Sequence, residues 1–107
     1  MRIGTLLILG LCACKPSVAE RTACIAGTHH LIEKGAYGWT TLNLHADGTF
    51  DGIQNRRCKT PPCDHDPGHG TWSVKGDAVN LAVVEEQQEH ELELDSKKCA
   101  LEGYRRE

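Results

Sequence analysis

The sequence predicts an all-β domain, a single antiparallel meander of six or seven strands that forms a small barrel or half-barrel. Two stretches, Leu42–Phe50 and Gly70–Leu81, place alternating apolar residues on either side of a tight turn that contains Asp and Gly. No window of 11 residues holds a convincing helical period. Short turns between consecutive strands are typical of a meander that closes or curls on itself.

The predicted strands follow one another along the chain, at 28–34, 39–46, 49–57, 70–75, 79–83, 90–94 and 99–104. In the third strand Phe50 and Ile53 fall on opposite sides by strict alternation, so we expect a β-bulge near Gly52. The segment 57–69 lacks alternation and contains three prolines, which predicts a loop.

Apolar residues on the inner faces of these strands form a modest predicted core: Leu31, Leu42, Leu44, Phe50, Trp72, Val74, Val79, Leu81, Val83, Leu92, Leu94 and Leu101. A domain this small buries a limited share of its surface and is marginally stable unless it is cross-linked. We therefore expect the cysteines to supply cross-links.

The spacing of these strands and turns resembles a known class of domain. The pattern Leu42-x-Leu44 with Asp47-Gly48-Thr49-Phe50, then Gly70-Thr71-Trp72, then the Leu92 and Leu94 pair, is similar to the small lipocalin-like β-domains of bacterial envelope lipoproteins. The N-terminal domain of NlpE and the META-type domains are examples. The resemblance implies a β-barrel fold and a binding role. The chain lacks the Cys-x-x-Cys motif of NlpE.

The N-terminus has the features of a lipoprotein signal peptide. The apolar run 3–11 is too short to span a bilayer but suits a signal-peptide core, and Leu11-Cys12-Ala13-Cys14 resembles the bacterial lipobox. We predict a signal peptide at 1–13, lipidation of Cys14, a lipidated tether at 14–23 and a β-domain at 24–107. A plain secretory signal is the alternative. Lys15 after the anchor points to the outer membrane, facing the periplasm.

Composition excludes one class of partner. The formal net charge of the chain is −3, and no cluster of basic residues occurs. Nucleic-acid binding depends on phosphate neutralisation by Lys and Arg, so we exclude it.

Four cysteines remain once Cys12 is removed with the signal and Cys14 is lipidated. An even number in an oxidising compartment normally forms disulfides. Three pairings are open, and we expect Cys24–Cys99 and Cys58–Cys63.

The segment around the second pair also suggests a metal site. His65 and His69, with Asp64 and Asp66 beside them, follow Cys58 and Cys63 closely, and copper or zinc accepts such ligands. Disulfide formation would remove the sulfur ligands and leave His65, His69 and an Asp. A solvent-exposed polar loop is the other interpretation, and we expect no cofactor.

Catalysis is not predicted. The three serines at 17, 73 and 96 lie outside any Gly-x-Ser-x-Gly context, and the carboxylates Glu89, Glu91 and Glu93 lack a partner nucleophile. The sequence therefore predicts a lipid-anchored envelope lipoprotein, a non-enzymatic binding or structural module that docks a protein partner in the periplasm. The alternative is a lipocalin-like module that binds a small ligand or copper or zinc through the Cys58–His69 loop.

Overall fold

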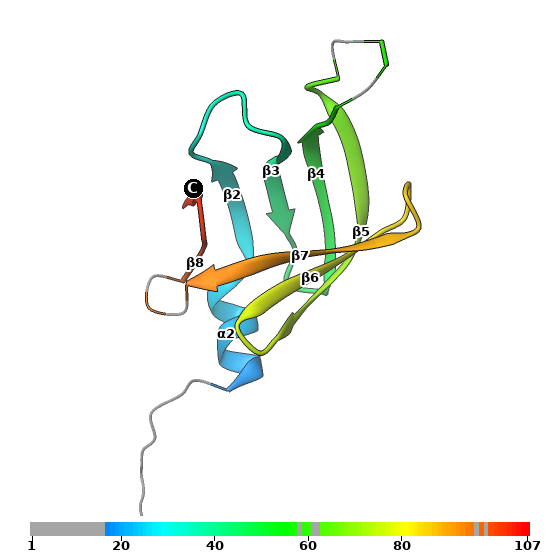
Figure 1. Ribbon diagram of the computed structural model, residues 1–107. Helices are drawn as coiled ribbons and strands as arrows, with labels where there is room; N and C mark the ends of the chain where they lie inside the picture. The colour runs from blue at the N-terminus through cyan, green and yellow to red at the C-terminus, as the bar shows by residue number, and fades with distance from the viewer. Residues whose placement is uncertain (1–16, 58, 61–62, 96, 98) are drawn as a thin grey trace, which may run out of the picture.

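The computed structural model describes residues 17–57, 59–60, 63–95, 97 and 99–107, which form one short helix and eight strands (Figure 1). The all-β class is confirmed, with one or two strands more than predicted. The elements are α2 (Val18–Ile25), β2 (Gly27–Leu31), β3 (Gly38–Leu44), β4 (Thr49–Asn55), β5 (Asp66–Lys75), β6 (Ala78–Val83), β7 (Gln88–Asp95), β8 (Ala100–Leu101) and β9 (Tyr104–Arg106).

The strands form one sheet in the order β8-β7-β6-β5-β4-β3-β2-β9, with each β-ladder antiparallel. β8 and β9 follow one another in the chain but lie at opposite edges of the sheet. The segment that joins them therefore crosses the junction between the two edges, here called the seam, and the barrel is nearly closed. Glu102 N–H donates to Glu93 C=O at 2.9 Å on one side, and Ile32 N–H donates to Gly103 C=O at 3.0 Å on the other. The single strand predicted at 99–104 is therefore two short strands.

Helix α2 lies against one end of the barrel (Figure 1). It begins with a capping box, in which Ser17 Oγ accepts from Glu20 N–H and Glu20 Oε1 accepts from Ser17 N–H. At its C-terminal end the Arg106 guanidinium donates to the carbonyls of Cys24 and Ala26.

The predicted tether at 14–23 therefore overlaps the folded domain, because 18–23 belong to α2. The Ser-x-x-Glu sequence at residues 17–20 was the local signal for this helix. Residues 14–16 and the predicted signal peptide at 1–13 lie outside the described residues.

The predicted core is confirmed. Ten of its twelve positions are buried, while Leu31 and Leu92 are half-buried and pack against the rest. Ile25, Trp39 and Tyr104 also belong to it, with exposures of 0%, 2% and 9%.

The irregularity predicted near Gly52 lies instead in the neighbouring strand β3, between Trp39 and Thr41. The extra residue lets Trp39 and Leu42, three positions apart, both face inward. β4 keeps strict alternation with Phe50 and Gln54 inward. The prediction was wrong because it placed Phe50 and Ile53 on the same face, whereas Ile53 stays on the opposite face and is half-buried.

Gly52 and Gly68 provide the space that Trp39 occupies. A Cβ on Gly68 would lie 2.6 Å from the Trp39 ring, and one on Gly52 would lie 3.0 Å from that ring and 2.4 Å from the Thr41 carbonyl oxygen. The Trp39 ring also meets Phe50 edge-on, with centroids 5.4 Å apart.

His29 is the one fully buried imidazole among the described residues, with 0% exposure. Its Nε2 donates to the Ile25 carbonyl at 2.7 Å, while its Nδ1 has no hydrogen-bond partner. Burial lowers the pKa of His29 below its usual value, because the charged form loses its hydration.

This lowered pKa predicts that the protein loses stability on acidification. As the pH falls below about 6.5, the unfolded chain takes up a proton at this position before the folded one does. The free energy of unfolding should therefore decline from pH 7 to pH 5, by at most about 1.4 kcal/mol per pH unit for this one group. His29→Gln keeps a donor for Ile25 but does not titrate, so urea denaturation should give it a shallower decline. Equal slopes in the two proteins would contradict the prediction.

Candidate functional site

The end of the barrel opposite α2 is formed by the segment 32–37 and residues 56–57 (Figure 1). The turn 84–87 lies at the side of the barrel in this view and is joined to that end by a hydrogen bond between Gln54 and Glu86. These three segments together are here called the loop end. A chain of hydrogen bonds crosses it. Trp39 Nε1 donates to His90 Nδ1 at 3.0 Å, and His90 Nε2 lies 2.9 Å from Glu86 Oε1. Gln54 Nε2 donates to the other carboxylate oxygen of Glu86 at 2.7 Å. Because His90 Nδ1 accepts, its neutral form carries the proton on Nε2.

Glu86 is the charged centre of this network, and its side chain is only 15% exposed. The hydrogen bond from Gln54 lowers the pKa of Glu86, and the nearby His90 and Arg56 act in the same direction, so the carboxylate is ionised at neutral pH. Arg56 is itself held by Asp66 at 2.8 Å. These side chains cover the loop end, and the polar groups named here are hydrogen-bonded to one another.

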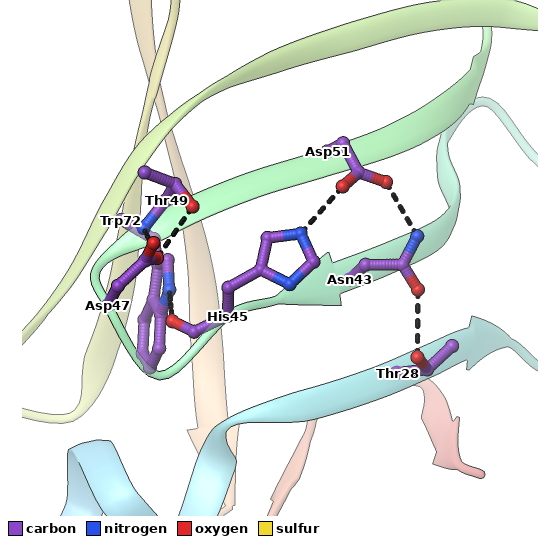
Figure 2. A network of polar contacts seen from close by, with 7 residues as sticks. All are labelled: Thr28, Asn43, His45, Asp47, Thr49, Asp51 and Trp72. Carbon is purple, nitrogen blue, oxygen red and sulfur yellow. Dashed lines mark hydrogen bonds and ion pairs between the residues drawn. The ribbon is translucent and has the colours of Figure 1, made fainter.

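A second polar network lies on the outer face of β2, β3 and β4 (Figure 2). Thr28 Oγ1 donates to Asn43 Oδ1 at 2.8 Å, and Asn43 Nδ2 donates to Asp51 Oδ1 at 2.7 Å. The other oxygen of Asp51 lies 2.7 Å from His45 Nε2. These bonds, chiefly the one from Asn43, lower the pKa of Asp51.

The adjoining turn is held by its own polar contacts. Asp47 accepts from the backbone and hydroxyl of Thr49, and Trp72 Nε1 donates to the His45 carbonyl at 2.8 Å (Figure 2). We interpret both sets of contacts as structural, because every dashed contact joins neighbouring strands or a turn.

The structure places the four predicted metal ligands in three separate contacts, two of which involve other residues. His65 Nδ1 lies 3.1 Å from Asp64, Asp66 pairs with Arg56, and His69 Nδ1 lies 2.5 Å from Glu85. His69 belongs to β5, opposite Asp51, and not to the predicted loop, because β5 begins at Asp66. Within the described part of the chain no group of three or more His, Cys, Asp or Glu side chains is arranged to hold a metal ion.

The Glu85 carboxylate accepts a hydrogen bond from the backbone N–H of His69 at 2.9 Å, and its other oxygen contacts Nδ1 of the His69 ring. The backbone contact is the main cause that lowers the pKa of Glu85. This pair ties the start of β5 to the turn between β6 and β7.

The predicted disulfide Cys24–Cys99 is confirmed, with Cα atoms 5.5 Å apart and a sequence separation of 75. Cys63 is disulfide-bonded, and its predicted partner Cys58 lies outside the described residues, so that pairing stays a prediction. Cys12 and Cys14 also lie outside them.

Large apolar side chains are exposed mainly at the loop end. Ile32, Tyr37 and Val84 are 64%, 58% and 57% exposed, while Val18, at 52%, lies at the α2 end. The guanidinium of Arg57 lies over the Tyr37 ring, 5.0 Å from its centroid. Tyr and Arg are, with Trp, the residue types enriched at binding hot spots.

Sequence reasoning missed Trp39, Gln54, Glu86 and Tyr104 as members of the loop end and its support. Tyr104 donates its hydroxyl to the Trp39 carbonyl, and burial raises the pKa of Tyr104 to about 12. The one signal in the sequence was that Trp39 and Tyr104 are two of the chain's five aromatic residues.

Comparison with known protein families, curated protein sequences and solved structures finds no match to this chain. The resemblance to lipocalin-like lipoprotein domains therefore stays a prediction. None of the helices among the described residues has the length and apolar character needed to cross a membrane.

Proposed function

We propose that this chain is a lipid-anchored envelope lipoprotein, a non-enzymatic module that docks a protein partner in the periplasm. The observation that carries this proposal is the filled barrel. Core side chains that are at most 9% exposed fill its interior, and Leu31, His90 and Leu92 are half-buried at its margin. Helix α2 covers one end, and the Trp39–His90–Glu86–Gln54 network covers the other. Binding therefore uses the outer surface.

The cysteines support the proposed location. A disulfide between the end of α2 and the start of β8 is typical of proteins that fold outside the reducing cytoplasm. The lipobox-like sequence ends at Cys14, three residues before Ser17. Three residues span at most about 11 Å, so a lipid there would hold the α2 end close to the membrane. The loop end would then face away from it.

The loop end offers the chemistry of a docking surface. Ile32, Tyr37 and Val84 expose apolar area, and Arg57 presents a cation stacked on an aromatic ring. The copper or zinc alternative finds less support, because the donors that it requires are divided among three pairs.

The anchor is tested by feeding cells an alkyne-tagged fatty acid and separating membranes from soluble proteins. The wild-type protein should carry the label and sediment with membranes. Cys14→Ser should lose both properties, whereas the matched variant Cys12→Ser should keep them. Membrane-bound Cys14→Ser protein would contradict the proposed anchor.

The same cells test the docking surface. A photoreactive amino acid is placed at Val84, at the loop end, or at Val18, which is similarly exposed at the α2 end. We expect a discrete crosslink to one envelope protein from Val84 and none from Val18. Crosslinks of equal yield from both positions would argue against docking through the loop end.

A further inference from the structure

Half of strand β7 has an edge that no described strand covers. On one side β7 pairs with β6 from Gln88 to Glu93. On the other side β8 pairs only with Leu94 and Asp95. In the described part of the chain, the outer edge of the segment 88–92 therefore has no strand partner. We call this uncovered edge the gap, because it is where the barrel stays open.

The hydrogen-bond pattern shows which backbone groups face this gap. Leu94 N–H donates to Asp77 on the β6 side, whereas the Glu93 carbonyl accepts from Glu102 on the β8 side. Backbone groups of alternate residues in an antiparallel strand point to opposite neighbours. The N–H and C=O groups of Glu89 and Glu91 thus point to the open edge.

Burial along β7 reflects the same gap. His90, Leu92 and Leu94 all face the barrel interior, yet only Leu94, beside β8, is buried. His90 and Leu92, beside the gap, are half-buried. An added strand would cover them as β8 covers Leu94.

The charge along the edge indicates what can bind there. Glu89, Glu91 and Glu93 are exposed on the outer face of β7 and form no ion pair with any described residue, although Asn80 donates to Glu89. A second copy adding through its own β7 would set one row of glutamates against another, which is destabilising. A cationic strand is the complementary occupant.

We propose that an extended segment of the partner protein, with Lys or Arg at alternate positions, adds as a strand to β7 at Glu89 and Glu91. This inference rests on the proposed docking function and specifies its surface and partner. Backbone hydrogen bonds would provide the pairing, and the carboxylates would select a basic segment. The gap begins next to the turn 84–87, so the strand would enter from the loop end.

The test uses the mature protein purified from membranes in detergent, and two synthetic peptides. One peptide alternates Lys with Val and Thr, and the other has Glu in place of Lys. We expect the Lys peptide alone to bind, and amide hydrogen exchange at Glu89 and Glu91 to slow at least tenfold on binding.

Three variants separate strand addition from simple charge attraction. Glu91→Pro removes one edge donor but no bond to β6, so it should fold and bind the Lys peptide at least tenfold more weakly. Glu89→Lys with Glu91→Lys should reverse the preference and bind the Glu peptide. Glu33→Lys, a single Glu-to-Lys change at an exposed site in the β2–β3 connection, should bind as the wild type does.

Several outcomes would overturn the proposal. Slow exchange at Glu89 and Glu91 without peptide would show that the edge is already covered. If Glu91→Pro binds the Lys peptide as the wild type does, the peptide is held by charge attraction alone and not by strand addition. If the wild-type protein forms a dimer that Glu91→Pro abolishes, the edge binds a second copy of this chain. If the peptide fails while Val84 still crosslinks to an envelope protein, the edge is wrong and the docking function stands. If neither peptide binding nor the Val84 crosslink is observed, the proposed docking function is contradicted as well.

Discussion

Gly70→Ala is expected to destabilise the protein by at least about 3 kcal/mol, enough to unfold most small domains partly or completely. Gly70 is buried in β5 between Phe50 of β4 and Val83 of β6. A Cβ there would lie 1.8 Å from the Ala82 carbonyl oxygen and 3.1 Å from the Phe50 ring. Because the first contact is with backbone, no side-chain rotation relieves it, and β5 and β6 must separate.

Thermal and urea denaturation followed by circular dichroism would measure this loss. Gly35→Ala is the matched control. Gly35 has φ +82° but no atom within 4 Å of its Cβ position, so this substitution should cost only the backbone penalty of about 1–2 kcal/mol. Equal losses in the two variants would show that space at Gly70 is not the reason for its glycine.

Removing the Cys24–Cys99 disulfide is the second large expected effect. Replacing both cysteines by serine should lower the free energy of unfolding by about 4.5 kcal/mol, because the bond closes a loop of 75 residues in the unfolded chain. It also fastens α2 next to β8, whose two residues pair only with the end of β7. We therefore expect the seam between β8 and β9 to open first.

Hydrogen exchange would locate this opening, and denaturation would measure its size. A variant with Cys58→Ser and Cys63→Ser is the control, since the predicted short link should contribute only roughly 2 kcal/mol in the same loop-entropy treatment. If the short link proved to matter more than the long one, loop closure would not be the source of the stability.

The strands were predictable because their signal is local. Alternation around the two turns correctly assigned inward residues such as Leu42, Phe50, Trp72 and Leu81, since successive side chains of a strand face opposite sides. Helix α2 was also encoded locally, by Ser17 and Glu20, but eight residues are too few to form a clear helical period.

The candidate sites were less predictable. His65 and His69 are close in sequence, but β5 begins between them and turns His69 toward Glu85. Trp39 and His90 are 51 residues apart and meet only because β3 and β7 curl around the same interior. The proximity of His65 and His69 in sequence thus suggested one metal-binding cluster, but the start of β5 separates the two histidines.

By itself, the sequence determined the all-β class and most of the core, because alternation and turn residues act over short ranges. The cysteine count indicated disulfides but left three pairings open, and the structure decided Cys24–Cys99. Only the tertiary structure decided where the barrel closes, that the β3 irregularity admits Trp39 to the core, and that half of β7 stays uncovered. These features depend on register and on the path of the last segment across the seam. Register is settled by packing among residues distant in sequence, and no local pattern contains that information.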